Sequence, residues 1–445
     1  MELTEHLFRH EWGRIVAAVT RIFGVHNLAL AEDVVQEAFC RAIEVWAFRG
    51  VPENPSAWLM KTAKNCALDV LRRERTARTF APELGRLLES EWTLAPVIEE
   101  AFGPNAIKDD LLRMMFSCCR PQVAEEAQVA LMLHILCGFS VDEIASALVT
   151  THAAVEKRIT RSKKTLAKSK KLFDVTTPAE FSPRLPAVHT ALYLLFNEGY
   201  HGANPEFAVR SDLCREAMRL TAVLLEHSLC ATPATYALAA LMCLNAARLP
   251  ARIDASGDLR SLFDQDRSAW DQRLIAEGMS FLDLSAKGSE VSEYHIEAAI
   301  ASVHATARRI EETDWGKIVS LYDSLMTTRP TPVVALNRAI AIAQRDGPDR
   351  GIKEIQAITD RDRLNSYPFY WAALGEFELR SKRYETANGH FRSALALARN
   401  EAERHFFGQR LQASETAMQV GILPAEVKEK IVNEFKADSE DSQVD

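Results

Sequence analysis

Helical periodicity runs through almost all of this 445-residue chain. Apolar residues recur every three or four positions in most long segments, whereas the strict alternation of a half-buried strand is hard to find. We find no convincing hairpin and no strand–helix–strand unit. The pattern therefore predicts an all-α protein. At about 100–200 residues per domain, the length suggests about two to four domains.

The composition is that of an ordinary globular protein, with 47% hydrophobic and 26% charged residues. No apolar run reaches the ~18 residues that a membrane span needs, and the N-terminus lacks the apolar core of a secretion signal. We therefore expect a cytoplasmic protein without a membrane segment. His134 and Cys137 share one predicted helix, but further ligands are not evident, so neither a metal nor a cofactor is expected.

The charge distribution is uneven although the formal net charge is −8. Basic residues gather in two stretches of about the first 175 residues, and the chain is acidic after Phe435. Local basic faces on an acidic protein favour DNA contact at defined places rather than general coating of nucleic acid.

Proline and glycine clusters divide the chain into units. An irregular, proline-containing stretch follows the basic run Arg72–Arg75, and three prolines between Thr176 and Pro186 begin a long helical extension. The expected units are 1–77, a linker at 78–108, a second unit at 109–175, the extension at 176–435 and an acidic tail at 436–445.

Residues 125–171 are predicted to form a helix-turn-helix. Ser140 and Glu143 have the spacing of a capping box after the helix breaker Gly138, and the third helix begins near Ala153. That helix and the residues after it carry Lys157, Arg158, Arg161, Lys163, Lys164, Lys168, Lys170 and Lys171. The second helix of such a motif enters the major groove, and its basic residues reach phosphates. The alternative is a solvated basic helix in a bundle.

The N-terminal unit combines aromatic, basic and amide side chains. A loop, Phe48-Arg49-Gly50, follows Trp46 and precedes a helix with basic and amide residues. Such groups suit single-stranded DNA, because bases stack on rings while cations hold the backbone. The alternative is that Trp46, Phe48 and Trp58 are core residues, and we expect Trp58 in the core with either function.

Four runs, AEDVVQEAFCRAI, FRG, SAWLMKTAKNCALDVLRRER and VEKRITRSKK, resemble regions 2 and 4 of extracytoplasmic-function sigma factors, members of the sigma-70 family. Their order and spacing also match, over about the first 175 residues. The resemblance implies a region 2 bundle at 1–77 and a region 4 helix-turn-helix at 109–175 in a bacterial protein that is not an enzyme. Its partners would be promoter DNA and core RNA polymerase, through the β′ clamp coiled coil and the β flap.

The resemblance also implies roles for individual residues. Asp33, Gln36 and Glu37 would face the β′ coiled coil. Phe48, Arg49 and Gly50 would capture a flipped −10 base, and Lys61, Lys64 and Asn65 would contact the opened strand. The −35 element would meet Glu156, Lys157, Arg158, Thr160 and Arg161. Many relatives carry a basic residue in place of Glu156, so their promoter preference cannot be carried over.

The extension resembles that of a sigma-factor subgroup with a tetratricopeptide-like C-terminal domain, through DDLLRMMFSCCRPQVAEEAQVAL and LYLLFNEGY. The tetratricopeptide spacing fits Trp371, Leu374, Gly375, Tyr384, Ala387, Phe391 and Ala394. A weaker copy lies at 337–358. Such helix pairs stack into a solenoid with a concave surface. We expect the extension to regulate the sigma core in cis and its repeat region to have a protein partner.

One polar element of the extension, Asn197-Glu198-Gly199-Tyr200, is a candidate regulatory site. It would hold the extension to the sigma core or bind a partner. The alternative is a helix C-cap, with Gly199 supplying the left-handed turn.

Other functions explain less of the chain. A helix-turn-helix regulator with a tetratricopeptide sensor leaves the N-terminal unit unexplained. An enzyme with a site at Glu198, Tyr200 and His201 would lack a phosphate loop, a nucleophile elbow or a metal quartet. A pure scaffold has no use for the basic recognition helix.

Overall fold

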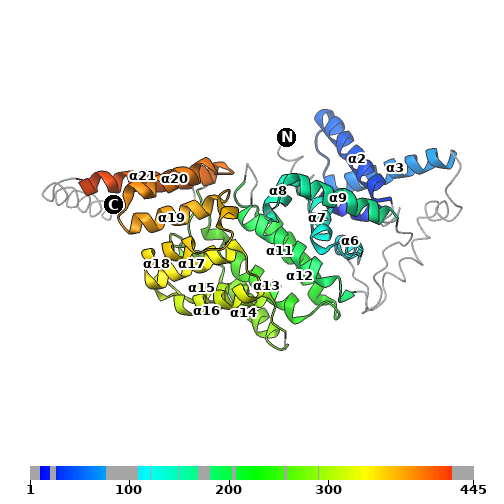
Figure 1. Ribbon diagram of the computed structural model, residues 1–445. Coiled ribbons are helices and arrows are strands. Elements are labelled where there is room, and N and C mark those ends of the chain that lie inside the picture. Colours follow the sequence, from blue (N-terminus) through cyan, green and yellow to red (C-terminus); the bar gives the residue numbers. More distant parts are fainter. Residues whose placement is uncertain are drawn as a thin grey trace, which may run out of the picture. The chain divides into compact units, whose positions relative to one another are not determined.

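The computed structural model of the protein is helical throughout its described part (Figure 1), which confirms the all-α prediction. It describes residues 11–20, 27–76, 109–168, 181–202 and 207–422, apart from 121, 149, 255–257 and 289. Within these ranges no strand is present, and one isolated antiparallel bridge joins Ile253 and Leu259. The expected linker at 78–108, Lys170, Lys171 and the acidic tail at 436–445 lie outside the described residues.

The chain forms two compact units. Unit 1 comprises residues 1–202, 209–242 and 280–289, and unit 2 comprises residues 203–208, 243–279 and 290–445. The first helices of the expected extension therefore belong to the same compact unit as the helix-turn-helix.

Unit 1 begins with helix 11–20, α2 (Leu28–Arg49) and α3 (Pro55–Thr76). One face of α2 is buried, with Ala31, Val34, Val35, Ala38, Phe39, Ala42 and Trp46. The small residues Ala63 and Ala67 on α3 are also buried and allow close packing of the two helices. Gly50 ends α2 with φ +76°, a conformation that side chains other than glycine rarely adopt.

The helix-turn-helix is built from α6 (Asp110–Cys118), α7 (Glu125–Leu136), α8 (Val141–Ala147) and α9 (His152–Ala167). The predicted capping box is confirmed: the Glu143 amide donates to Ser140 Oγ (3.1 Å), and the Ser140 amide donates to Glu143 Oε2 (2.8 Å). Gly138 has φ +70° and turns the chain between α7 and α8. Val155 and Ile159 are buried, so the opposite face of α9 is left for solvent.

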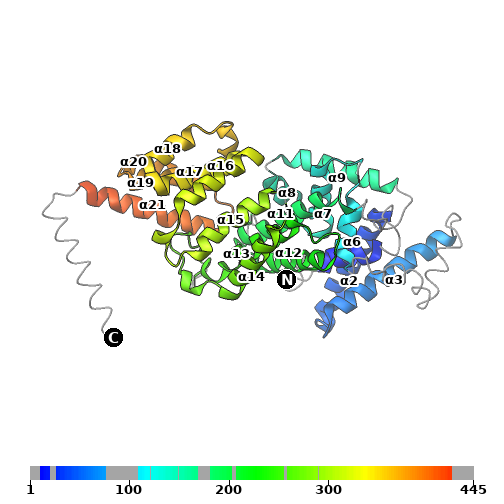
Figure 2. The same ribbon diagram turned by 90° about the horizontal axis from the view of Figure 1, so that it is seen from below.

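The extension contributes α11 (Leu185–His201), α12 (Ser211–Glu226) and most of α13 (Pro233–Ala246) to unit 1. Figure 2 shows α11 and α12 beside α7 and α6, and α11 packs against both. Phe116 of α6 meets Phe181 edge to face, with ring centroids 5.1 Å apart. The helix-turn-helix and the start of the extension therefore share one apolar core.

Unit 2 is a succession of helices in which neighbours along the chain pack together. Its longer helices are α14 (Gln272–Ser285, in part), α15 (Glu293–Thr306), α16 (Trp315–Thr328), α17 (Pro332–Asp346), α18 (Pro348–Gln356), α19 (Pro368–Arg380), α20 (Tyr384–Ala396) and α21 (Glu401–Ile422). Single 3-10 turns lie at Leu249–Ala251, Arg267–Ala269, Ile310–Glu312 and Arg361–Leu364.

The predicted repeat at 371–394 coincides with the helix pair α19 and α20. A Cβ on Gly375 would lie 2.8 Å from the ring of Phe391, so only glycine allows this approach. Ala387 and Ala394 are fully buried on the facing helix. Small residues thus bring the two helices together around one large ring, as the spacing predicted. The weaker copy at 337–358 falls on α17 and α18.

Candidate nucleic-acid interface

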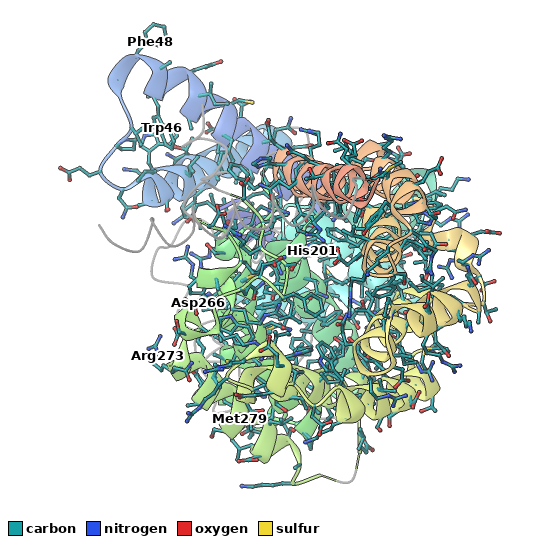
Figure 3. All side chains as sticks on the ribbon, turned by 90° about the vertical axis from the view of Figure 1, so that its left-hand side faces the viewer. Trp46, Phe48, His201, Asp266, Arg273 and Met279 are labelled. Carbon is teal, nitrogen blue, oxygen red and sulfur yellow. The ribbon has the colours of Figure 1, made fainter. Side chains whose placement is uncertain are left out.

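The last turn of α2 presents an exposed aromatic ring to solvent, so the predicted loop at Phe48-Arg49-Gly50 is wrong for its first two residues, which are helical. Phe48 is 93% exposed and projects from the end of the helix, whereas Trp46 turns inward and is only 8% exposed (Figure 3). We expected Trp58 in the core, but it is half-buried, with its ring edge to face on Trp46 at 5.4 Å between centroids. Trp58 packs against the end of α2, where Trp46 is the last buried residue, so the core covers only part of its ring. Phe48 contributes little to this core.

The other predicted single-strand contacts are also exposed. Arg49 is the last residue of α2 and Gly50 caps the helix, and no atom lies within 4 Å of a Cβ built on Gly50. Lys61, Lys64 and Asn65 are exposed on α3. Their spacing of three and four residues places them on one face of that helix.

The exposed face of α2 carries the predicted polymerase contacts. Asp33, Gln36 and Glu37 are all exposed, opposite the buried Val34 and Ala38. Glu37 Oε1 accepts a hydrogen bond from Arg41 Nε at 2.9 Å, so part of its charge is balanced within the helix. This leaves an acidic and amide patch that a basic partner helix could cover.

The recognition helix presents four of its five predicted DNA contacts. Glu156, Lys157, Thr160 and Arg161 are exposed on α9. Arg158 is half-buried and donates to Glu126 of α7, so its charge is shared with a carboxylate. This pairing could not be predicted from local sequence patterns, because the two residues are 32 positions apart.

His152 is a residue of this face that the sequence analysis missed. It begins α9, where the Thr151 side chain accepts a hydrogen bond from the Ala154 amide. His152 Nδ1 lies 2.7 Å from Asp142 Oδ1, and this hydrogen bond raises the pKa of His152. The imidazole lies at the N-terminal end of α9, where the helix dipole favours anions.

The described cysteines and possible metal ligands form neither a metal site nor a reactive thiol site. Across the described ranges, no three His, Cys, Asp or Glu side chains come together as a metal site. Burial raises the pKa of Cys118 and of Cys137 to about 12, so both stay protonated, as inert thiols do. None of the described helices has the length and apolarity to cross a membrane.

Comparison with known families agrees with this geometry. Residues 7–77 match Sigma-70 region 2, and residues 113–166 match Sigma-70, region 4. The chain thus carries two domains of the sigma-70 family, which support a sigma-70 family factor. It is a transcription initiation factor and not an enzyme. Region 2 thus contains α2 and α3, and region 4 contains most of α6 together with α7, α8 and α9. Residues 184–286, at the start of the extension, match a family of unknown function, DUF6596.

Two bacterial proteins are similar to this chain. An uncharacterized protein of Rhizobium meliloti (strain 1021) is 37% identical over 415 residues, which are 93% of this chain and 96% of that protein. A probable RNA polymerase sigma factor, RfaY, of Xanthomonas campestris pv. campestris is 29% identical over 154 residues, 34% of this chain and 36% of its own. The long extension is therefore shared with the first relative along nearly its whole length.

The regulatory candidate in the extension makes a buried contact with region 4 of this sigma factor. Arg210, 7% exposed, places Nη2 2.7 Å from Glu198 Oε1 and 3.3 Å from Glu143 Oε1. Its guanidinium also lies 6.0 Å from the ring centroid of Phe139. Glu198 of α11 and the capping residue of α8 are thus held by the same cation.

Gly199 does not end α11, so the C-cap interpretation was wrong. The helix continues to His201, and the described glycines with positive φ are Gly50, Gly138 and Gly347. A Cβ on Gly199 would instead lie 2.7 Å from both the Arg210 carbonyl oxygen and the Cys214 amide nitrogen. Glycine is needed here for close approach to α12, and its carbonyl accepts the Arg210 amide at 2.7 Å. Asn197 is half-buried beside it, and Tyr200 stacks on Phe196.

A second ion-pair cluster joins α12 to region 2 and to the N-cap of α6. Arg219 donates to Asp109 Oδ2 (2.8 Å) and to Glu216 Oε2 (2.8 Å), and Glu216 also accepts from Arg14 of helix 11–20 (3.2 Å). Burial alone would raise the pKa of Glu216, but the hydrogen bond and charge of Arg219 and the charge of Arg14 lower it. Asp109 uses its other oxygen to cap α6. We call Arg14, Asp109, Glu216 and Arg219 the α12 cluster.

Proposed function

We propose that this chain is an extracytoplasmic-function sigma factor that binds core RNA polymerase, recognises the −35 and −10 promoter elements and promotes initiation. The observation that carries the proposal is Phe48, which is 93% exposed at the end of a helix whose two other aromatic residues, Phe39 and Trp46, are buried. A bare ring has no role in folding but suits an unpaired base.

The opened −10 strand would be held by the C-terminal end of α2 and by α3. A base that leaves the duplex loses its stacking and pairing, at a cost of a few kcal/mol, and needs a new partner. Phe48 offers a ring for it, and stacking on an aromatic side chain contributes about 1–3 kcal/mol per base. Lys61 and Lys64 would neutralise phosphates while Asn65 hydrogen-bonds the opened strand.

The −35 element would be read by α9 in the major groove. Lys157, Thr160 and Arg161 are exposed and ready to contact phosphates or base edges. Glu156 could accept from a cytosine N4, which favours a promoter different from those of relatives with a basic residue there. Arg158 would have to leave Glu126 before it could reach DNA.

The polymerase would be bound through α2. Asp33, Gln36 and Glu37 form an exposed patch suited to a basic helix, as the resemblance to region 2 implies for the β′ clamp coiled coil. The β flap would take region 4. Such a factor works in the bacterial cytoplasm, where the polymerase is.

The extension would regulate this sigma core in cis. Its first helices share an apolar core with region 4 and bind it through Arg210. The helix pairs of unit 2, which we interpret as tetratricopeptide-like, would offer a surface to a protein partner. Removing the whole extension would uncover the apolar face of α7, so substitutions test its role better than truncation.

Binding to core polymerase tests the proposal. We expect full-length protein to bind purified core polymerase, and Asp33→Arg to weaken that binding about tenfold or more, because a like charge would face the basic partner. Glu385→Arg makes the same charge change at an exposed position of α20 and should bind as the unsubstituted protein does. The proposal fails if the protein does not bind, or if both variants bind equally well.

A further inference from the structure

Unit 2 contains an open pocket of about 610 Å³ at the junction of two successive helix pairs, α15–α16 and α17–α18. Its lining comes from the end of α16, the first half of α17, the end of α18 and the turn that follows, all within unit 2. It lies outside the residues that match the three families. Pockets that bind small molecules usually measure about 300–1,000 Å³, so this one has the volume for such a ligand.

One wall of the pocket is held by ion pairs. Arg338 of α17 donates to Asp323 Oδ1 of α16 at 2.6 Å and to Glu354 Oε2 of α18 at 2.9 Å. Glu354 also pairs with Arg350, one turn earlier on α18, at 2.7 Å. Because the Arg338 guanidinium is bound from both sides, it fixes three helices around the pocket. A preformed wall of this kind lowers the ordering that a ligand would have to impose on the protein.

The pocket also has an apolar wall. Met326 packs on the core formed by α15, α16 and α17, and Ile358 packs on the core formed by α17, α18 and α19. Both side chains are only partly buried in these cores and also line the pocket. Four further apolar residues complete this wall: Pro330, Pro332, Ala335 and Ala357. A ligand with an apolar body would remove this surface from water.

Two charges of opposite sign lie on the rim of the pocket. Asp360 and Arg363 both line it, and both are exposed. They belong to one turn, in which the Arg363 amide donates to the Asp360 carbonyl oxygen at 3.0 Å, but within the described part of the chain neither side chain has an ion-pair partner. Asp360 has φ +56°, a left-handed conformation that is uncommon outside glycine, asparagine and aspartate. Such backbone is frequent beside ligand sites.

We propose that this pocket binds a short peptide with free ends. At neutral pH such a peptide carries an ammonium group at one end and a carboxylate at the other. Asp360 would bind the ammonium group and Arg363 the carboxylate, while the apolar wall contacts the side chains between them. A ligand with a single charge would leave one rim residue without a partner, and one amino acid would fill only part of the volume. Binding requires neither polymerase nor DNA, so the inference does not depend on the proposed function.

Isothermal titration calorimetry of the full-length protein with trialanine tests the proposal. We expect a dissociation constant of about 1 mM or lower, in the range of weak specific binding. N-acetyl-trialanine lacks the ammonium charge and trialanine amide lacks the carboxylate. Each should bind about five- to tenfold more weakly than trialanine, because each loses one charge-assisted contact at a partly exposed rim. Trialanine blocked at both ends should bind more weakly than either.

Two variants assign the ends of the peptide to the two rim charges. Asp360→Asn should weaken trialanine binding about five- to tenfold and leave the binding of N-acetyl-trialanine unchanged, because that contact is already lost. Arg363→Gln should weaken trialanine in the same way and leave trialanine amide unchanged. Asparagine tolerates the left-handed conformation at position 360, so the turn keeps its shape. Asp362→Asn is the matched control, exposed in the same turn but outside the pocket lining, and should bind trialanine as the parent protein does.

Loss of binding that follows the pairing of each variant with its own end of the peptide supports the site. Trialanine that gives neither binding heat nor a higher melting temperature at concentrations up to about 10 mM overturns the proposal. Equal binding of the doubly blocked peptide also overturns it, because the rim charges would then not recognise free ends. Equal weakening by Asp360→Asn and Asp362→Asn would show that the peptide binds outside this pocket.

Discussion

Arg210 Nη2 lies 3.3 Å from Oε1 of Glu143, the residue that completes the capping box of α8. Arg210 lies beyond the residues that match region 4, which end at 166. A side chain of the extension therefore binds the first turn of α8 within the helix-turn-helix. Region 4 and the start of the extension are one structural body, and four predictions follow from its contacts and from the exposed groups around it.

Arg210→Met should destabilise unit 1 by about 3–5 kcal/mol, because it leaves the carboxylates of Glu143 and Glu198 buried without their cation. Chemical denaturation monitored by circular dichroism measures the change. Arg215→Met, at an exposed position one turn along α12, should alter the free energy of unfolding by less than about 0.5 kcal/mol. Equal stability of the two variants would show that the buried ion pairs are unimportant for the fold.

Gly199→Ala should cost about 1–3 kcal/mol of stability, because the added methyl group would overlap the backbone of Arg210 and Cys214. Gly389→Ala is the matched control on α20, where nothing lies within 4 Å of the added atom. Helix propensity predicts that this control gains up to about 1 kcal/mol. Thermal melts of both variants decide the matter, and a stabilised Gly199→Ala protein would contradict the close approach of α11 and α12.

Phe48→Ala should leave the free energy of unfolding within about 0.5 kcal/mol of its original value, because the ring is exposed. Promoter opening should nevertheless weaken by about 1–3 kcal/mol, the usual contribution of a base stacked on a ring. A fluorescent base analogue in the −10 element reports opening. Trp46→Ala is the converse variant and should cost about 3 kcal/mol of stability, because that ring is buried. Unchanged promoter opening with Phe48→Ala would show that the ring of Phe48 does not stabilise the opened −10 strand.

Affinity for −35 DNA should fall as the pH rises through the range just above 6.5. The hydrogen bond to Asp142 raises the pKa of His152, so its positive charge is fully present below the ordinary pKa and is lost as the pH passes the raised one. Asp142 and Glu156 are the carboxylates that act on this imidazole. Fluorescence anisotropy between pH 6 and 8.5 measures the slope. His152→Gln should flatten it, and an unchanged slope would assign the titration to another group.

The features that sequence alone predicted are local ones. The capping box at Ser140, the turn at Gly138 and the buried face of α9 depend on residues within a few positions of one another. The repeat spacing placed Gly375 and Phe391 on two neighbouring helices, and the structure adds that the ring of Phe391 lies against Gly375. Short-range patterns of this sort fix helices and their ends whatever the rest of the chain does.

The features that sequence missed depend on distant partners. Lys163 was expected to contact DNA phosphates, but it binds Glu32, 131 positions away. Gly199 resembled a helix end because glycine often follows the last helical turn, whereas its real constraint is the backbone of α12. The ion pairs of Arg210 could not be predicted, because the position of a single arginine in the sequence does not show which buried carboxylates it will bind. Tertiary contacts of this kind have no periodicity in the sequence.

Run-off transcription with purified core RNA polymerase is the most direct test of the central claim. Genomic fragments are transcribed with core enzyme alone and with core enzyme and this protein. The account predicts discrete new start sites that share −35 and −10 sequences. If the protein gives no new start sites, although it is folded and the same core enzyme responds to another sigma factor, the chain does not act as a sigma factor.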